Sequence, residues 1–398
     1  MSSLIHRGLR GTLARTRSGA VSESPAAAVP GNLGRFVLVV DTQWPQPERD
    51  SGSLRMVQLL RLLRELGWPV VFMGDDGDGD AAARERLTAL GVHCLTGSRG
   101  RRLAWLQEHR DDLAAAILSR HHAAGHWLPT LRLMAPAARL IFDSVDLHFL
   151  REQREADANG SFAQRLLARW TRRRERRLFR RADHGWVVSQ VEQALLRQLV
   201  PDADVTIVSN IVDPRDSTPG FPGRNGLLFV GAYGHRPNVD AVEWLLAEIL
   251  PHVQARLPQV TLHLVGGGMP QWLQQRAQAL PGVRVHGHVP ELEPLLDQAR
   301  VGLAPLRFGA GVKGKVNQSL ANGLPMVATR VAVEGMTLRD ATEILVADDG
   351  ASFAAQIVRL HEDAALWQRL ADNGRRHMRA HFSREQAKSV VARSLPSA

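Results

Sequence analysis

Short apolar runs rich in β-branched residues alternate with amphipathic helical stretches along most of the chain, and this alternation limits the fold more than any other feature. Residues 36–41 (FVLVVD) and 69–73 (PVVFM) are two such runs. Helical spacing of apolar residues is evident near residues 54–66 and 239–250. Strands that alternate with helices are typical of parallel sheets covered by helices. The sequence therefore predicts an α/β fold.

The runs fall into two series, separated by a stretch rich in proline and glycine at residues 213–226. The predicted strands are 36–41, 69–73, 114–118, 139–143, 184–188 and 205–208 in the first series, and 227–230, 261–265, 283–285, 301–304, 325–328 and 344–346 in the second. Such a break favours a domain boundary. We expect two doubly wound, Rossmann-like domains at residues 35–212 and 213–382. A basic, disordered extension at 1–34 and a C-terminal helix at 383–398 that packs back toward the first domain complete the prediction.

Composition agrees with two ordinary domains and narrows the setting. The 398 residues are 44% hydrophobic and 23% charged, which is enough to build two cores. No run of about 20 apolar residues is present, so no membrane-spanning helix is expected. Cys94 is the single cysteine, which excludes an internal disulfide and a cysteine-based metal cage and suits a reducing cytoplasm.

Positive charge is concentrated in one predicted helix. The net charge is +10, and the segment 165–181 contains Arg165, Arg169, Arg172, Arg173, Arg174, Arg176, Arg177, Arg180 and Arg181, with Leu166, Leu167, Trp170, Leu178 and Phe179 among them. At helical spacing the apolar residues are expected to form one stripe that packs on the domain. Two interpretations of the arginines stay open: a solvated face, or peripheral contact with an anionic membrane at the inner face of the cell. Nucleic acid is not expected, because no aromatic platform or nucleic-acid motif accompanies the charge.

Lysine is rare, and its placement points to a site. Two of the three lysines, Lys313 and Lys315, lie in the glycine-rich segment 308–315 (FGAGVKGK). A compact ammonium beside glycine amides suits a phosphate or pyrophosphate. The helix expected from about Val316 would add its positive end. Two further glycine turns, at 231–234 and 266–268, follow predicted strands and are expected at the same edge of the second sheet.

The segment 308–328 (FGAGVKGKVNQSLANGLPMVA) resembles the donor-nucleotide region of GT-B fold glycosyltransferases of family 4, the retaining group 1 enzymes. Residues 229–240 and 287–294 are similar to that family's first glycine loop and base-contacting strand end. In the first half, residues 50–55 resemble its acceptor-side glycine loop and residues 142–151 its segment at the interdomain cleft. The resemblance extends over roughly residues 35–382. It implies the GT-B fold and a hexosyltransferase-type activity (EC 2.4).

The resemblance implies a role for each matching residue. The donor-binding set is Gly231, Tyr233, His235, Arg236, Gly266, His288, Val289, Gly309, Ala310, Gly311, Val312 and Gln318, with His288 and Val289 at the nucleobase and Gln318 at the ribose. Lys313 and Lys315 would stabilise the diphosphate that leaves. Tyr233 would stack on or hydrogen-bond a ligand, or be a half-buried turn residue. Gly52, Ser53 and Arg55 would lie on the acceptor side.

Three polar residues at the end of one predicted strand, Asp143, Asp146 and His148, are candidates to orient the acceptor hydroxyl or to bind the donor sugar. Which of the three has that role is left open. The alternative is a capping aspartate with a surface histidine.

The chain departs from the family at two positions. Many members have two glutamates, separated by seven residues, where this chain has Ala310 and Gln318. The expected activity is transfer of a sugar from a nucleotide diphosphate sugar to a hydroxyl acceptor, such as a lipid-linked or polysaccharide precursor. A nucleotide-sugar epimerase of the same fold and a catalytically weak binding subunit remain alternatives.

No cofactor and no metal are expected. The acidic segment 75–80 (DDGDGD) has neither the glycine nor the glutamate that a calcium loop would need at Ala81 and Leu87, and it is expected to be a solvated loop. His121, His122 and His126 have loose metal-ligand spacing but no adjacent carboxylate, so they are expected to be loop residues near the cleft.

Overall fold

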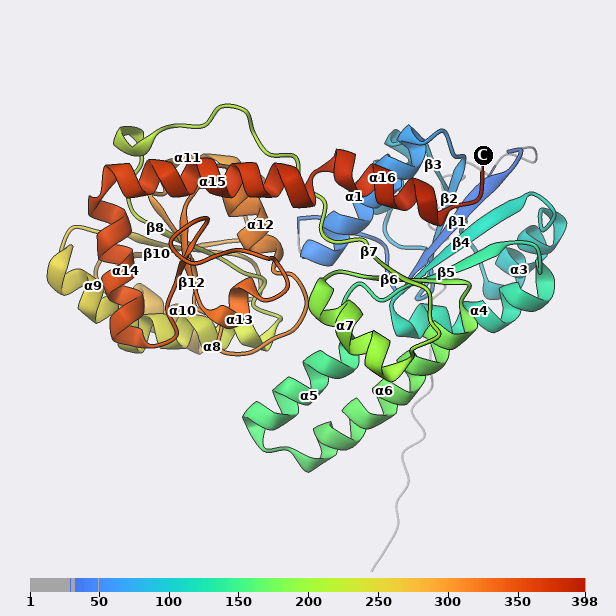
Figure 1. Ribbon diagram of the computed structural model, residues 1–398, viewed down its shortest axis with the longest axis horizontal. Coiled ribbons are helices and arrows are strands. Elements are labelled where there is room, and N and C mark those ends of the chain that lie inside the picture. The colour runs from blue at the N-terminus through green and yellow to red at the C-terminus, as the bar shows by residue number, and fades with distance from the viewer. Residues whose placement is uncertain (1–28, 30–32, 49, 398) are drawn as a thin grey trace, which may run out of the picture.

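The computed structural model describes residues 29, 33–48 and 50–397. Within them the chain forms two α/β domains that lie side by side (Figure 1). Most of the extension predicted at residues 1–34 lies outside the described residues.

In the described part of the first domain, seven parallel strands form one sheet in the order β3-β2-β1-β4-β5-β6-β7. The strands are β1 (Phe36–Asp41), β2 (Val70–Gly74), β3 (Val92–Cys94), β4 (Leu113–Ser119), β5 (Arg139–Asp143), β6 (His184–Val187) and β7 (Val205–Ile207). The helices are α1 (Ser51–Glu65), α2 (Ala81–Ala89), α3 (Arg99–Glu108), α4 (His121–Met134), α5 (His148–Asn159), α6 (Phe162–Arg181) and α7 (Gln190–Leu199). The strand order reverses between β1 and β4, where open α/β sheets bind their ligands.

The second domain repeats this plan with six described parallel strands in the order β10-β9-β8-β11-β12-β13. The strands are β8 (Leu227–Val230), β9 (Leu262–Val265), β10 (Val283–Gly287), β11 (Val301–Ala304), β12 (Met326–Ala328) and β13 (Leu345–Val346). The helical elements are η1 (Phe221–Gly223), α8 (Arg236–Trp244), the π-helical turn η2 (Leu245–Ile249), α9 (Leu250–Arg256), α10 (Gln271–Gln278), α11 (Glu293–Gln298), α12 (Gly314–Ala321), α13 (Arg330–Val333), α14 (Gly350–Glu362) and α15 (Ala364–Phe382). The prediction of two doubly wound domains is confirmed.

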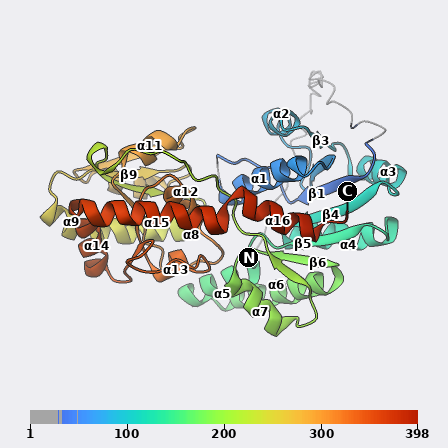
Figure 2. The same cartoon turned by 45° about the horizontal axis from the view of Figure 1, so that its top comes forward.

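The last helix, α16 (Arg384–Ser394), returns to the first domain. It continues directly from α15 and lies over α1 (Figure 2). Val391 and Leu395 are buried in the same apolar cluster as residues of α1. At the crossing, Arg384 donates to Glu65 at 2.7 Å and to Asp213 at 2.5 Å, which ties the end of α1 to the connection between the domains.

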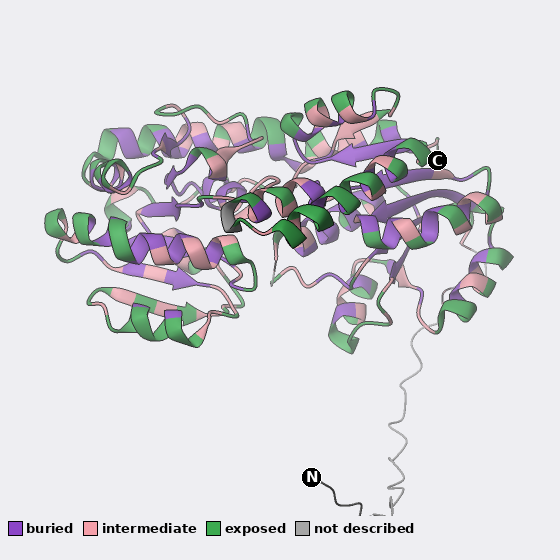
Figure 3. Ribbon diagram, turned by 90° about the horizontal axis from the view of Figure 1, so that it is seen from below, coloured by how far each residue is buried: buried purple, intermediate pink, exposed green. Residues whose placement is uncertain are grey.

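The sheets are buried on both faces. Along β1, Phe36, Leu38 and Val40 pack into one apolar cluster while Val37 and Val39 pack into another on the opposite face. Figure 3 shows most of the strands as buried and the outer faces of the helices as exposed; the edge strand β10 alternates between partly buried and exposed residues. Burial on both faces explains why these strands are continuous apolar runs without alternating polar residues.

Most of the predicted strands occur within one or two residues of their expected ends. The sequence did not predict β3, a three-residue strand at the edge of the first sheet that pairs with β2 alone. Its sequence, Val-His-Cys, is too short to show a period.

The expectation for the arginine-rich helix is wrong in one respect. Its apolar residues do not form one stripe: Leu178 and Phe179 are buried against the domain, whereas Leu166, Leu167 and Trp170 are 47%, 51% and 54% exposed. Helices α5 and α6 pack on each other and project together from one edge of the first domain (Figure 1).

Candidate functional site

The cleft between the domains contains a small pocket with walls from both. Arg151 and Glu155 of α5 contribute from the first domain, and His235, Arg236 and Gly309 contribute from the second. Its volume is about 180 Å³. The loops that follow the strands of both sheets meet here, because both sheets direct their carboxyl ends toward the cleft.

Lys313 lies immediately before α12 at the edge of this cleft. Its Nζ donates to the carbonyl oxygens of Ala310 and Gly311 at 3.0 and 2.6 Å. Burial lowers its pKa to about 8. The backbone of the loop therefore holds the ammonium beside the positive end of an eight-residue helix.

Lys315, in the first turn of α12, is also partly buried. Its Nζ donates to Oδ1 of Asn238 at 2.6 Å and lies 4.2 Å from the centre of the Phe229 ring. Burial, with Lys313 nearby, lowers its pKa to about 7. Within the described residues, neither Lys313 nor Lys315 forms an ion pair with a carboxylate. A partly buried cation without an acidic partner is unfavourable until an anion binds.

Glycines let the neighbouring turns come close together. Gly266 has φ +135°, and a Cβ there would lie 1.9 Å from the carbonyl oxygen of Gly231. Gly309 and Gly311 also have positive φ, at +138° and +70°. A Cβ on Gly311 would lie 3.1 Å from Cβ of Asp146 in the first domain. The lysine loop therefore approaches the opposite domain at a position where a larger residue would be strained.

Tyr233 and His235 follow the first glycine turn but differ in exposure. Tyr233 is 3% exposed, and its hydroxyl has no hydrogen-bond partner in the structure. Burial raises its pKa. Its ring packs in the core of the second domain, 6.3 Å from that of Phe229. His235 and Arg236 are exposed and line the cleft pocket.

The remaining predicted donor residues surround the same edge of the second sheet. His288 follows β10 and is exposed, and Val289 packs on a small apolar cluster behind it. A Cβ on Gly267 would lie 3.5 Å from Cβ of His288, so the β9 and β10 loops are adjacent. Val312 accepts a hydrogen bond at 3.3 Å from Asn210 of the connection between the domains. Gln318 lies on the second turn of α12 and is partly exposed.

In the first domain, Arg55 and Asp143 bind each other in the core. The guanidinium donates to both carboxylate oxygens, at 2.8 and 3.0 Å, and the residues are 2% and 0% exposed. Ser119 donates to the same carboxylate at 3.0 Å. The structure therefore places Arg55 and Asp143 behind the wall of the cleft.

Asp146 and His148 lie at the cleft itself. His148 Nδ1 is 3.0 Å from Asp146 Oδ1, and Arg151 donates to the other oxygen at 2.5 Å. Burial alone would raise the pKa of Asp146, but His148 and Arg151 outweigh it and hold that pKa well below its usual range. Burial lowers the pKa of His148, and Asp146 more than compensates, so the net shift is upward.

Gly52 and Ser53 lie in the first turn of α1, where the acceptor-side loop (residues 50–55) meets the lysine loop (residues 308–315). Ser53 donates through N and Oγ to Asp50, which caps the helix, both at 2.8 Å. A Cβ on Gly52 would lie 2.8 Å from Arg120, and one on Gly314 would lie 2.4 Å from Cβ of Ser51. The acceptor-side loop is thus in contact with the start of α12.

Sequence reasoning named His121 and His122 as residues near the cleft, but it did not predict that they lie at the start of α4 and contact each other. His121 and His122 are not loop residues, as was expected, but helical, with ring centres 3.8 Å apart. His121 lies 4.8 Å from the ring of His148 and is 1% exposed, and neither of its nitrogens has a hydrogen-bond partner among the described residues. Burial lowers its pKa to about 3, so it is neutral at pH 7. Only the order of β4 and β5 in the sheet brings these rings together.

Sequence reasoning also did not predict the ion pair that crosses the cleft. Arg154 of α5 donates to both oxygens of Glu334, at 2.5 and 2.8 Å, and to the carbonyl oxygen of Gly309 at 2.7 Å. The two side chains are about 30% exposed. No sequence signal separates Arg154 from its many neighbouring arginines.

The acidic segment 75–80 is a mostly exposed loop, as expected, and it also makes structural contacts. Asp75 accepts from Trp127 at 2.8 Å and lies 2.6 Å from His126, which corrects the expectation that no carboxylate adjoins the histidines. Asp78 pairs with Arg102 at 2.7 Å. Among the residues described, no cluster of three or more His, Cys, Asp or Glu has the arrangement of a metal site.

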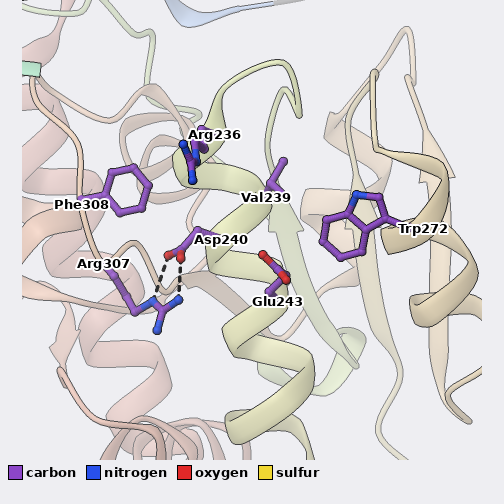
Figure 4. A pocket seen from close by; sticks show the side chains of 7 residues that line it. All are labelled: Arg236, Val239, Asp240, Glu243, Trp272, Arg307 and Phe308. Carbon is purple, nitrogen blue, oxygen red and sulfur yellow. Dashed lines mark hydrogen bonds and ion pairs between the residues drawn. The ribbon is translucent and has the colours of Figure 1, made fainter. Parts of the chain in front are cut away.

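A larger hollow, of about 580 Å³, lies outside the cleft on the outer side of α8 (Figure 4). Arg307 pairs there with Asp240 at 2.5 Å, opposite Trp272. Arg236 borders both this hollow and the cleft pocket. Neither lysine lines either hollow, but their loop meets the first domain, at Gly309 through Arg154 and at Gly311 beside Asp146. The cleft is therefore the candidate site.

Parts of the chain are similar in sequence to known proteins. Residues 224–363 match the sequence model of the family described as Glycosyl transferases group 1. An uncharacterized 44.6 kDa protein in the cps region of Klebsiella pneumoniae is 22% identical over 172 residues, and that match spans 42% of this chain and 44% of the relative.

Solved structures resemble the whole chain. HepE from Anabaena, in complex with UDP and glucose, has a TM-score of 0.68 and 14% identity, over 90% of this chain and 99% of its own. Sucrose-phosphate synthase from Thermosynechococcus elongatus gives 0.67 and 18%, over 90% and 98%. WaaG, a glycosyltransferase involved in lipopolysaccharide biosynthesis, gives 0.62 and 14%, over 91% and 100%.

The two domains therefore have the GT-B fold of glycosyltransferases. The second domain, which contains the lysine loop, is similar to the family described as Glycosyl transferases group 1 over residues 224–363.

Proposed function

We propose that this chain is a retaining glycosyltransferase that moves a sugar from a nucleotide diphosphate sugar to a hydroxyl acceptor. One observation carries the proposal: Lys313 and Lys315 lie at the start of α12, in the loop that borders the cleft, and no carboxylate in the described structure pairs with them. A diphosphate would supply the missing negative charge. Fixed positive charge on a leaving diphosphate is a major source of catalysis in group transfer, and we propose that no metal is needed.

The donor would lie along the edge of the second sheet. The turns at Gly231 and Gly266 leave room for close approach, and Gln318 offers a side-chain amide to a ribose hydroxyl. On the opposite wall, Asp146 and His148 would contact the sugar or the acceptor. The complex of HepE with UDP and glucose supports a nucleotide-sugar ligand in a cleft of this fold.

The acceptor is proposed to be a precursor of a polysaccharide or other glycoconjugate, carried on a lipid and modified in the cytoplasm. The relative from a cps region and the likeness to WaaG support this class of acceptor.

In the described part of the chain, no helix is long and apolar enough to cross a membrane.

A thermal-shift screen with UDP, GDP, ADP and dTDP tests the donor site, because a ligand of the native state raises the melting temperature. Lys313→Ala and Lys315→Ala should each weaken binding of the selected nucleotide about tenfold or more, since charge-assisted contacts are worth roughly 1.5–3 kcal/mol. The matched control is Lys388→Ala. Lys388 is the third lysine of the chain and lies on α16. Equal nucleotide binding by all three variants would contradict the proposal.

Two rival functions have specific tests. An epimerase of this fold would convert the free donor without an acceptor, which product analysis by NMR detects. A weak binding subunit is favoured by Ala310 and Gln318 at the positions where many relatives have glutamates. Nucleotide binding without transfer to any acceptor, with transfer gained by Gln318→Glu, would favour the subunit.

A further inference from the structure

The paired helices α5 and α6 carry an exposed surface that the cleft does not use. Of the large apolar side chains that the structure shows as exposed, four lie in the first half of α6. They are Phe162, Leu166, Leu167 and Trp170, at 70%, 47%, 51% and 54% exposure. We call this group the apolar end of α6.

Three of the four side chains of the apolar end lie on the opposite side of α6 from its packing face, and Leu167, four residues before Thr171, lies at the edge of that face. Packing on the domain uses Ala168, Thr171, Glu175, Leu178 and Phe179. Phe162, Leu166 and Trp170 follow one another at intervals of four residues, so they share one side of the helix. Folding therefore leaves most of this side exposed to solvent, and the guanidinium of Arg174, on the same helix, lies 5.3 Å from the centre of the Trp170 ring.

Arginines continue the same side toward the other end of α6. Arg173 and Arg177 follow Trp170 at intervals of three and four residues, and both are exposed. The exposed arginines beyond the apolar end are Arg172, Arg173, Arg177, Arg180 and Arg181, and we call them the basic band. Arg165 and Arg169 lie among the apolar side chains, and Arg165 pairs with Asp157 of α5 at 3.2 Å. The one carboxylate of α6, Glu175, is buried and accepts from the amides of His148 and Phe149 at 3.1 and 3.2 Å. No acidic residue of α6 therefore offsets the band at the surface.

The two groups are separated along the helix axis. At 1.5 Å per residue, the apolar end occupies about 12 Å from Phe162 to Trp170, and Arg173 to Arg181 occupy about the next 12 Å. Amphipathic elements at a bilayer surface bury apolar side chains about 5–10 Å deep and keep cations among the headgroups. The length and order of the two groups match that arrangement.

We propose that α5 and α6 dock this protein on a membrane containing anionic phospholipid, with the apolar end inserted and the basic band on the lipid phosphates. Charge complementarity selects this partner. A symmetric contact with a second copy would bring two arginine-rich helices together. A nucleic acid would match the band but not the leucines.

Docking in this way would also fix the position of the cleft relative to the membrane surface. Helix α5 starts at His148 in the cleft wall and ends beside the apolar end, 12 residues or about 18 Å away. The cleft would open close above the lipid headgroups, within reach of an acceptor held in the membrane. The docking surface itself does not depend on the proposed transfer reaction.

Sedimentation of the full chain with vesicles tests the proposal without any nucleotide. Vesicles of 30% phosphatidylglycerol in phosphatidylcholine should bind the protein at least tenfold more tightly than pure phosphatidylcholine, and 0.5 M salt should weaken that binding. The double variants Leu166→Ser/Leu167→Ser and Arg173→Gln/Arg177→Gln should each lose about tenfold or more. Leu133→Ser on α4, where Leu133 is 86% exposed, and Arg369→Gln on α15 are matched controls and should bind like the parent.

Each variant is expected to keep its fold because the substituted side chains are exposed. Thermal melting of each variant checks this. Bromolipid quenching of tryptophan fluorescence should fall in Trp170→Phe while vesicle binding is retained. Absent binding to anionic vesicles, or unchanged binding in both double variants, would overturn the proposal. So would tighter binding to RNA or DNA than to the vesicles, or a dimer that Leu166→Ser/Leu167→Ser dissociates. Nucleotide binding is measured separately, so failure of the donor site and failure of the docking surface are distinguishable.

Discussion

The pKa of Lys315 predicts that nucleotide binding takes up a proton near neutral pH. In the free protein, burial lowers that pKa to about 7, so about half of the molecules carry a neutral amine at pH 7. A bound diphosphate favours the ammonium and raises the pKa again. Affinity should therefore fall as pH rises above 7, because each binding event must first protonate the amine.

The expected size of the effect follows from this titration. At pH 9 only about 1% of the free protein would have Lys315 charged, against about half at pH 7. If the bound ammonium stays charged over this range, the titration of Lys315 lowers affinity about 50-fold, or about 2.3 kcal/mol. Lys313, with a pKa of about 8, adds a further loss of about tenfold, which Lys315→Arg should keep. The stability of the free protein changes in the opposite direction with pH. Between pH 7 and the unfolded value of 10.5, the unfolded chain binds the additional proton, so Lys315 adds stability as pH rises.

Isothermal titration calorimetry with the nucleotide selected by thermal shift measures both quantities. Titrations at pH 7, 8 and 9 give the affinity, and buffers of different ionisation enthalpy at one pH give the number of protons taken up. Lys315→Arg keeps a cation that does not titrate below pH 12, so its affinity should lose most of this pH dependence. Lys388→Arg is the control and should behave as the parent does.

Constant affinity from pH 7 to pH 9 would refute the reasoning, as would the same pH dependence in the parent and in Lys315→Arg. Either result would mean that the ammonium is solvated in the free cleft, or that the nucleotide binds elsewhere.

Three further predictions concern the structure around the cleft. Gly266→Ala should lower the free energy of unfolding by roughly 2 kcal/mol or more, because its Cβ would collide with the carbonyl oxygen of Gly231 at a positive φ; a stability within 0.5 kcal/mol of the parent in urea unfolding would contradict this. Arg154→Ala should change stability by less than about 1 kcal/mol, because its pair with Glu334 is partly exposed, yet it should increase the radius of gyration in X-ray scattering; an unchanged radius would show that the pair does not hold the domains together. Burial raises the pKa of Glu175 to about 8, above an unfolded value of 4.5, so stability should fall as pH rises from about 5 to 8, and Glu175→Gln should weaken that fall; identical pH profiles of the two proteins would exclude Glu175 as its cause.

How much of the candidate site could be predicted depends on how far apart in the sequence the interacting residues are. The lysine loop was recognisable because Lys313 and Lys315 are adjacent in a glycine-rich stretch, and local chemistry alone suggests a phosphate there. Asn238, the residue that Lys315 contacts, is 77 positions away, and no local pattern marks it. The roles of the predicted donor and acceptor residues stay predictions.

Asp143 and Asp146 illustrate the same limit within three residues. Their sequence context made them equal candidates. Arg55, 88 positions away, binds Asp143 in the core, whereas Asp146 lies at the cleft beside Gly311 of the other domain. Strand order and domain contact decide between them, and neither is written in the local sequence.

By itself, the sequence determined the fold class, because sheets buried on both faces need apolar strands and intervening amphipathic helices, and both leave a period that can be read directly. It also determined that two lysines share one glycine loop. Only the tertiary structure decided which polar groups meet in the cleft, and which apolar side of α6 faces the core. A helical period gives the angle between side chains on one helix, but the surroundings of that helix come from segments distant in sequence. Leu178 became buried and Leu166 stayed exposed for that reason.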